Sequence, residues 1–183
     1  MNTSRLRLRQ WRDDDLPAFA ALNADPEVMR YFPAPLSEEA SDHMARHCRD
    51  LITSRGWGLW AVEVRETKTF IGFVGLHEPG HDLPFSPCVE IGWRLARPHW
   101  GKGYATEAAQ RALRYAFERL ALDEVVSFTS VGNLPSRAVM ERLGFQNSHA
   151  NFAHPALALD DPLSEHVLYK LSESRWRDQR VEA

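Results

Sequence analysis

The chain has 183 residues, of which 44% are hydrophobic and 26% charged, and its formal net charge is −3. This length supports one domain with a hydrophobic core, so we expect a single domain over residues 1–183 whose core covers about 5–171. Lysine and arginine are scattered along the chain, which argues against nucleic acid as a partner.

The cysteine content and the apolar runs also narrow the protein class. Cys48 and Cys88 are far apart, which argues against a disulfide framework or a paired-cysteine zinc site. No stretch approaches the ~18 apolar residues that a membrane span needs. We therefore expect a cytoplasmic protein without a membrane partner.

The first part of the chain is predicted to hold a strand followed by helices. Residues 5–11 alternate between polar and apolar side chains, which is typical of a strand with one buried face. The carboxylates of residues 13–15 predict a capped, solvated turn before a helix over 16–22. Asp25 followed by Pro26 predicts the start of another helix.

The next elements are a long helix, a hairpin and an irregular loop. The spacing predicts a helix over 37–55 that ends at Gly56. Residues 57–64 and 69–77 are rich in β-branched and aromatic side chains and predict a β-hairpin. The proline-rich loop 78–87 is expected to lie outside the core and to border a ligand site.

A strand, helix, strand unit follows. Residues 88–95 predict a fourth strand, and Gly92 suggests a bulge or a close approach by another group. An apolar stripe over 108–120 predicts a helix that packs on a sheet. Residues 124–129 predict a fifth strand, which should run parallel to the fourth.

The last part of the chain is predicted to contain a short helix and late strands. The helix is expected to start at Pro135 and to end at Gly144, with strands from Phe145 onward and over 166–171. The charged tail 172–183 is expected to fray, apart from a docked Trp176.

The turn from Gly101 to Gly103 leads directly into a helix and is suited to phosphate. The first N–H groups of a helix lack partners within the helix and lie at the positive end of its dipole. Two glycines allow a ligand to approach the backbone closely. A glycine turn alone is weak evidence, because many strand-to-helix junctions use glycine only for geometry.

Further motifs make this turn specific. They are Glu90-Ile91-Gly92-Trp93-Arg94-Leu95, then Trp100-Gly101-Lys102-Gly103-Tyr104-Ala105-Thr106-Glu107-Ala108, then Asn133-Leu134-Pro135-Ser136 with Gly144-Phe145. Together they resemble the acetyl-CoA core of the GNAT N-acetyltransferases, in particular the RimJ/RimL-type branch. The resemblance covers about residues 6–171. It implies an α/β (α+β) fold: a mixed, twisted sheet of six to seven strands, helices on both faces and a splay between strands four and five.

The resemblance also implies how acetyl-CoA is bound. Backbone amides of the turn and helix start would bind the pyrophosphate, and main-chain groups of the fourth strand would pair with the pantetheine arm. Asn133 matches the residue that hydrogen-bonds the pantetheine amide, and Ser136 matches one that assists the departing thiolate. The complete set of implied cofactor-binding residues is Trp93, Arg94, Leu95, Gly101, Lys102, Gly103, Tyr104, Ala105, Thr106, Asn133 and Ser136. The family usually has Arg or Gln where this chain has Trp100.

Two catalytic roles follow. Many relatives have a tyrosine four residues before the Gly-Phe pair, but Met140 stands there and cannot donate a proton, so Ser136 becomes the candidate that assists the leaving group. The reaction needs a neutral amine, and Glu90 is our candidate general base, acting directly or through water, with His77 as the alternative. Alternatively, Glu90 has no catalytic role and is a strand carboxylate that forms an ion pair.

The acceptor side is less well defined by the sequence. Tyr31, Phe32, His77 and His154 are expected to contact the acceptor. His43 and His47 are one turn apart on a helix, but without a third ligand we expect an exposed face and no metal site.

Several alternatives remain open. The acceptor is either a protein or peptide N-terminal α-amine or a small-molecule amine such as an amino acid, polyamine or antibiotic. A non-catalytic acetyl-CoA-binding protein is a rival. Cys88 lies close to Glu90 in sequence and leaves a covalent route open. Relatives are often homodimers.

Overall fold

The computed structural model describes residues 1–181, which form two compact units. Met1–Leu76 and Gly92–Ala112 make up the first unit, and His77–Ile91 with the chain from Leu113 onward make up the second. Strand β4 (Glu90–Leu95) and helix α3 (Tyr104–Glu118) contribute residues to both. In the described part of the chain, no helix is long and apolar enough to span a membrane.

Hydrogen bonds connect eight strands in the order β1-β2-β3-β4-β5-β8-β6, with β7 paired to β8. Strands β4 and β5 (Glu124–Ser130) run parallel, with Glu90 opposite Val126, whereas β1–β2, β2–β3, β5–β8, β6–β8 and β7–β8 are antiparallel. This confirms the predicted mixed sheet. The strand predicted from Phe145 onward is β6 (Gln146–Asn147). The count exceeds the expected six or seven because β7 (Phe152–Ala153) has only two residues, too few for a periodic pattern.

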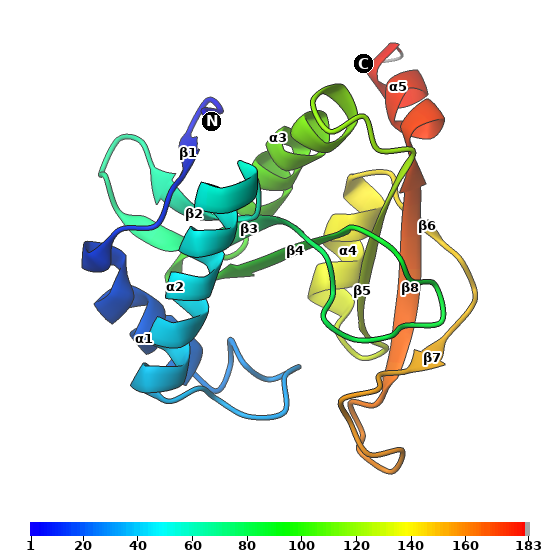
Figure 1. Cartoon of the computed structure of the whole chain (residues 1–183), viewed down its shortest axis with the longest axis horizontal. Coiled ribbons are helices and arrows are strands. Elements are labelled where there is room, and N and C mark those ends of the chain that lie inside the picture. The colour runs from blue at the N-terminus through cyan, green and yellow to red at the C-terminus, as the bar shows by residue number, and fades with distance from the viewer. Residues whose placement is uncertain (182–183) are drawn as a thin grey trace. The chain divides into compact units, whose positions relative to one another are not determined.

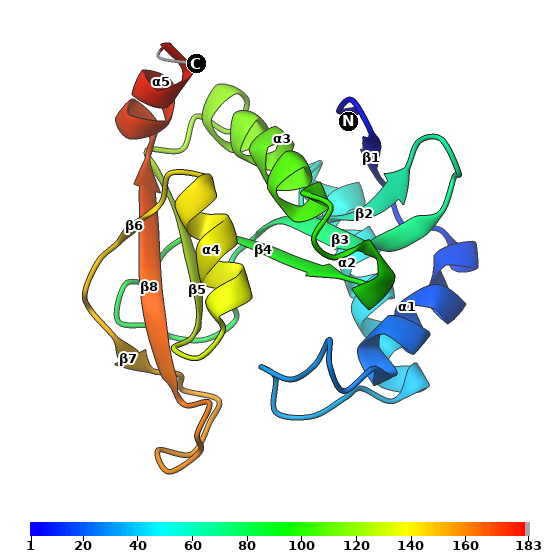
Figure 2. The same ribbon diagram turned by 180° about the vertical axis from the view of Figure 1, so that it is seen from behind.

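The first unit contains β1 (Leu6–Arg9), β2 (Leu59–Val64) and β3 (Phe70–His77), which extends one residue into the second unit. Helix α2 (Glu38–Arg55) lies over one face of β2 and β3 in Figure 1, beside α1 (Leu16–Ala24), and the start of α3 lies on the opposite face in Figure 2. The core between the helices and the strands consists of Trp11, Phe19, Leu22, Val28, Ala45, Cys48, Ala61 and Phe73.

Helix α2 begins and ends at the predicted residues. Ser37 accepts a hydrogen bond from the backbone N–H of Ala40 at 3.2 Å, and Gly56 ends the helix in a left-handed conformation with φ of 83°. The helix predicted at Asp25-Pro26 is wrong. The carboxylate of Asp25 accepts from the N–H of Glu27 at 2.9 Å, so this segment forms a turn that continues into irregular structure.

The acidic run before α1 also differs from the expectation. Residues 13–15 form a short 3-10 helix, and Asp15 is buried, with 3% of its surface exposed. Both oxygens of Asp15 accept from the guanidinium of Arg9 at 2.7 Å, and Arg9 also contacts the buried Glu63 at 2.9 Å. The predicted solvated turn is therefore wrong for Asp15, because a strand arginine forms a bidentate pair with it.

Gly72 in β3 allows the neighbouring strand to approach closely. Its φ is 134°, and a Cβ at this position would lie 2.1 Å from the carbonyl oxygen of Arg94. Gly92, in contrast, has no described atom within 4 Å of its Cβ position, so the space that a side chain would occupy there is open. A close approach to Gly92 by another group stays a prediction, and within the described chain the tight approach to the fourth strand is at Gly72.

The second unit is built on β5 and the antiparallel β8 (Glu165–Ser172). Their pairing begins with Glu124 opposite Ser172 and ends with Ser130 opposite His166. Helix α4 (Leu134–Arg142) contacts β5. The tail differs from the prediction, because Glu173–Val181 form helix α5, and residues 182–183 lie outside the described part. The expected docking of Trp176 is confirmed: it is buried, and its ring centroid lies 5.0 Å from that of Phe117.

Candidate active site

In the first unit, a glycine turn precedes helix α3. The 3-10 turn Arg97–His99 leads into it, Gly101 and Gly103 have φ of 70° and 77°, and α3 begins at Tyr104. Within residues 1–181, none of the backbone N–H groups of residues 101–106 donates to another part of the chain. A Cβ at Gly101 would meet no described atom within 4 Å, so the backbone is open to a ligand. These features fit the pyrophosphate of acetyl-CoA.

Two contacts that the sequence did not reveal hold this turn in place. The indole N–H of the exposed Trp100 donates to the carbonyl oxygen of Leu95 at 2.6 Å. Glu107, in the first turn of α3, accepts from Thr3 and Ser4 and from the backbone and side chain of Arg5, at 2.5–3.0 Å. Burial alone would raise the pKa of Glu107, but hydrogen bonds from Thr3, Arg5 and Ser4 lower it.

The Trp93-Arg94-Leu95 segment of β4 is expected to present main-chain groups to the cofactor. The carbonyl oxygen of Leu95 already accepts from Trp100. Trp93 is half-buried, and Lys102 is exposed. The predicted role of Arg94 concerns only its backbone, and its side chain is buried, with 8% of its surface exposed.

In the second unit, Asn133 and Ser136 lie at the start of α4. Asn133 caps the helix: its Oδ1 accepts from the N–H of Ser136 at 3.3 Å, and its Nδ2 donates to Thr129 at 2.8 Å. The hydroxyl of Ser136 has no hydrogen bond to the described residues and is half-buried. Met140 is buried at 1% exposure, which fits its expected inability to act in proton transfer.

Glu90 and His77, which the sequence offered as alternative bases, are paired in the second unit. Nε2 of His77, at the end of β3, lies 2.8 Å from Oε2 of Glu90, at the start of β4. Glu90 is 8% exposed. The sequence placed His77 at the end of the third strand and Glu90 within the fourth, but it did not place the two side by side, because the strand register that joins them depends on distant contacts.

Cys88 lies two residues before Glu90 and is a free thiol, like Cys48. Burial and the nearby Glu90 carboxylate raise the pKa of Cys88. A nucleophilic cysteine needs the opposite environment, one that favours the thiolate. The environment of Cys88 is therefore not one that favours a nucleophilic thiolate.

His154 belongs to an aromatic cluster in the second unit. Its ring centroid lies 4.9 Å from that of His166, 5.2 Å from that of His81 and 6.1 Å from that of Phe128. Burial, His166 and His81 lower the pKa of His154, so its imidazole is neutral near pH 7. This environment explains the position of His154 by packing, and its contact with the acceptor stays a prediction.

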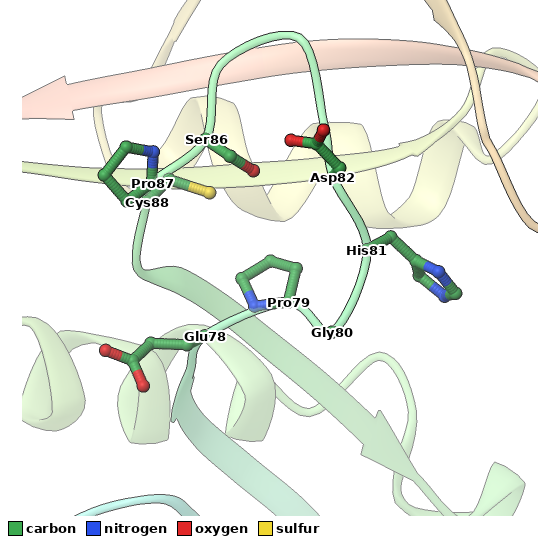
Figure 3. Close-up of a pocket in the computed structure, with 8 residues that line it drawn as sticks. All are labelled: Glu78, Pro79, Gly80, His81, Asp82, Ser86, Pro87 and Cys88. Carbon is green, nitrogen blue, oxygen red and sulfur yellow. The ribbon is translucent and has the colours of Figure 1, made fainter.

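The loop between β3 and β4 borders a cavity of about 310 Å³ (Figure 3). Asp82 and Ser86 point toward one another across the loop, and His81 points away from it (Figure 3). The lining residues are Glu78, Pro79, Gly80, His81, Asp82, Ser86, Pro87 and Cys88. The expectation that this loop lies outside the core is wrong for Leu83, which is buried with 3% of its surface exposed. A ligand site beside the loop stays a prediction.

The remaining candidates lie in the first unit. Phe32 is 37% exposed, and its ring centroid lies 4.1 Å from Cζ of Arg94, while the adjacent Tyr31 is half-buried. His43 and His47 are both exposed on α2, as expected, and no group of three potential metal ligands occurs among the described residues.

Comparison with known proteins identifies the family. Residues 5–146 match the family model described as an acetyltransferase (GNAT) domain. The FsC-acetyl coenzyme A-N(2)-transacetylase of Aspergillus fumigatus is 34% identical over 159 residues, which cover 83% of this chain and 67% of that protein.

Solved structures of acetyltransferases share the fold of this chain. An acetyltransferase from Agrobacterium tumefaciens is 31% identical with a TM-score of 0.73, covering 93% of this chain and 92% of that one. The spermidine N-acetyltransferase of Vibrio cholerae, solved with CoA and spermine, shares the fold at 24% identity, with a TM-score of 0.75 and coverage of 96% and 99%. The chain therefore belongs to the GNAT acetyltransferase family and is an acetyl-CoA-dependent N-acetyltransferase that acts on an amine.

Proposed function

We propose that this enzyme moves the acetyl group directly to a primary amine, with Glu90 as the general base. The pairing of Glu90 with His77 carries this proposal. A buried carboxylate 2.8 Å from an imidazole can take a proton from the attacking amine, directly or through water, and the half-exposed imidazole offers the proton a path to solvent. A lysine amine needs more help from this base than the less basic α-amine.

We propose that the turn before α3 holds the cofactor by its backbone. The N–H groups of residues 101–106 would bind the pyrophosphate, with the Lys102 ammonium adding a positive charge. Main-chain groups of Trp93, Arg94 and Leu95 would bind the pantetheine arm, and so would the Asn133 side chain. Asn133 uses one of its two N–H donors and one of its two acceptor sites within the chain, so a second N–H and a second lone pair remain for the pantetheine amide.

Acetyl-CoA supplies the acetyl group and leaves as a thiolate. Ser136 would donate a hydrogen bond or a proton to that sulfur, since its hydroxyl has no other partner in the described chain. A thiol leaves moderately well without help, so the Ser136 contribution is expected to be smaller than that of Glu90.

The proposed acceptor is a protein or peptide N-terminal α-amine, as the RimJ/RimL-type motifs suggest, or a small-molecule amine. A spermidine N(1)-acetyltransferase of Vibrio cholerae is among the relatives, and spermidine is a small polyamine, which supports the second choice. We propose a cytoplasmic enzyme on the basis of its two free cysteines, and a homodimer by analogy with relatives.

The test of this function is thiol release from acetyl-CoA across amino acids, polyamines, aminoglycosides and short peptides. Glu90→Gln is expected to lower kcat with the preferred amine by about 10²- to 10⁴-fold, because general base catalysis is lost. Cys88→Ala is the matched control on the same strand end and should retain turnover.

Two outcomes would overturn parts of this proposal. Unchanged turnover of Glu90→Gln near neutral pH would remove Glu90 as the base. Lost turnover of Cys88→Ala with intact acetyl-CoA affinity would replace direct transfer by a covalent route. Tight acetyl-CoA binding without thiol release to any amine would instead support the non-catalytic alternative.

A further inference from the structure

Helix α4, which contacts β5 in the second unit, carries a polar stripe toward the sheet, where apolar side chains are the rule. Asn133, Arg137 and Glu141 follow one another at four-residue spacing, so they lie on one face of the helix. Each of them is hydrogen-bonded to a side chain of β5 or β8. Hydrogen bonds are directional and apolar packing is not, so this stripe fixes the rotation of α4 about its axis.

Tyr169 of β8 is the centre of these contacts. Its side chain is 2% exposed, and its hydroxyl donates to a carboxylate oxygen of Glu141 at 2.9 Å. The same hydroxyl accepts from Nε of Arg137 at 3.4 Å. One phenol thus bridges a guanidinium and a carboxylate that lie one turn apart on α4. Hydrogen bonds to charged groups are about twice as strong as those between neutral groups, so this bridge holds the helix firmly.

Arg137 extends the network to the first turn of α4. Its Nη1 donates to the carbonyl oxygen of Val131, in the segment between β5 and α4, at 3.0 Å. Thr129 of β5 accepts from Asn133 at 2.8 Å. The register of β5 and β8 places Thr129 and Tyr169 on the same face of the sheet. The start of α4 is therefore held to this face at two levels.

The hydroxyl of Ser136 depends on this network for its direction. Ser136 precedes Arg137 in the first turn of α4, and its hydroxyl makes no hydrogen bond to the described residues. Successive residues of an α-helix are about 100° apart, so even a small rotation of α4 moves the Ser136 side chain away from a fixed reaction partner.

We propose that Tyr169 is a positioning residue for acetyl transfer, because it fixes the rotation of α4 and so aims the Ser136 hydroxyl at the departing thiolate. This inference rests on the role of Ser136 in the proposed function. Tyr169 acts through Arg137 and Glu141. It is not itself the proton donor, since its buried hydroxyl already donates to Glu141.

The test is a double-mutant cycle on kcat between Tyr169→Phe and Ser136→Ala. Phenylalanine keeps the buried ring and removes only the hydroxyl. We expect Tyr169→Phe alone to lower kcat about three- to tenfold, because a misplaced catalytic group loses much of its effect. In the Ser136→Ala background it should change kcat by less than about 1.5-fold, because both substitutions remove the same contribution. A loss of folded protein would lower kcat by the same factor in both backgrounds.

Two arginine substitutions on α4 provide a matched pair. Arg137→Gln should behave in this cycle like Tyr169→Phe, because it breaks the contacts to Tyr169 and Val131. Arg142 is exposed on the same helix, and Arg142→Gln should leave kcat unchanged.

A second measurement does not depend on turnover. The backbone N–H groups of Ser136 and Arg137 both donate to Asn133. Their hydrogen exchange, followed by NMR, should be at least about threefold faster in Tyr169→Phe, whereas exchange in β5 should not change.

The outcomes separate this inference from the proposed function. An equal loss of kcat in both backgrounds, or unchanged exchange at the start of α4, would overturn the positioning role of Tyr169 and leave the acetyltransferase proposal standing. Unchanged kcat of Ser136→Ala would remove Ser136 from the proposed mechanism, and the positioning role with it.

Discussion

Helices α3 and α4 begin in different ways, although the sequence assigns acetyl-CoA contacts to both. At α4, the side chain of Asn133 accepts from a first-turn N–H and donates to Thr129, so the chain satisfies its own helix start. At α3, the N–H groups of residues 101–106 donate to nothing in the described chain. One start is capped, and the other is open.

Side-chain hydrogen bonds hold the turn before α3 in place, although its own backbone N–H groups make none to the described residues. Glu107 holds the segment around Arg5, whose guanidinium in turn donates to the carbonyl oxygen of Lys102 at 3.0 Å, and Trp100 bonds to Leu95. The donors are thus positioned before a ligand arrives, which lowers the entropy cost of binding. The unpaired backbone N–H groups of the turn before α3 therefore point to a ligand. The start of α4 is capped by Asn133 and needs no ligand to explain it.

Between the two helix starts, the largest effect on acetyl-CoA binding should come from blocking the amides at the start of α3. Gly103→Val forces a β-branched residue into a left-handed conformation with φ of 77° and crowds the amides. We expect acetyl-CoA affinity to fall at least about 30-fold, or roughly 2 kcal/mol, measured by isothermal titration calorimetry.

Lys102→Gln is the matched variant for the same turn, since it removes the charge and keeps the backbone. It should weaken binding only about two- to threefold and chiefly at low salt. If the lysine variant lost as much affinity as the valine variant, charge rather than the amides would dominate the open start.

An intermediate effect is expected at the capped start. Asn133→Ala removes the cap and should lower the free energy of unfolding by about 1 kcal/mol in a denaturant titration. Asn133→Ser keeps a capping oxygen but loses the amide donor, so it should restore most of that stability. Acetyl-CoA affinity separates the capping role of Asn133 from its proposed contact with pantetheine. If Asn133 only caps the helix, the serine variant should bind acetyl-CoA with full affinity. If Asn133 also contacts pantetheine, both variants should bind acetyl-CoA less tightly.

The smallest effect concerns how stability depends on pH through the ion pair and hydrogen bonds between Glu107 of α3 and residues 3–5. The pKa of Glu107 is lower in the folded protein than its ordinary value, so its contribution to stability is present above the unfolded pKa and is lost as the pH falls through the folded pKa. Glu107→Gln should therefore destabilise the protein by about 0.5 kcal/mol near pH 7, because solvent screens the interaction, and by less under acidic conditions. Thermal unfolding from pH 7 down to acidic pH measures this; an equal loss at every pH would contradict the ionic brace.

Local signals explain most of what the sequence predicted correctly. Ser37 and Gly56 bound α2, the glycines at 101 and 103 precede α3, and the parallel pairing of β4 with β5 follows from the intervening helix. Each depends on a few neighbouring residues or on a chirality rule.

Errors arose where distant residues decide the outcome. Asp15 is buried because Arg9 reaches it, and the tail forms a helix in which Trp176 packs against Phe117. The same holds for the candidate site. The motif predicted the turn that is proposed to bind acetyl-CoA. The pairing of His77 with Glu90 and the inward orientation of Arg94 depend instead on strand register and on residues far away in sequence.

The missing side chain at Gly72 has a consequence for the geometry of the fourth strand. The carbonyl of Arg94 occupies the space where a Cβ at position 72 would stand, so even an alanine there would push this part of β4 away from β3. A substitution outside the predicted cofactor-binding residues would then displace the Trp93–Leu95 backbone that is proposed to hold the pantetheine arm. An engineering library for cofactor affinity should therefore leave position 72 as glycine.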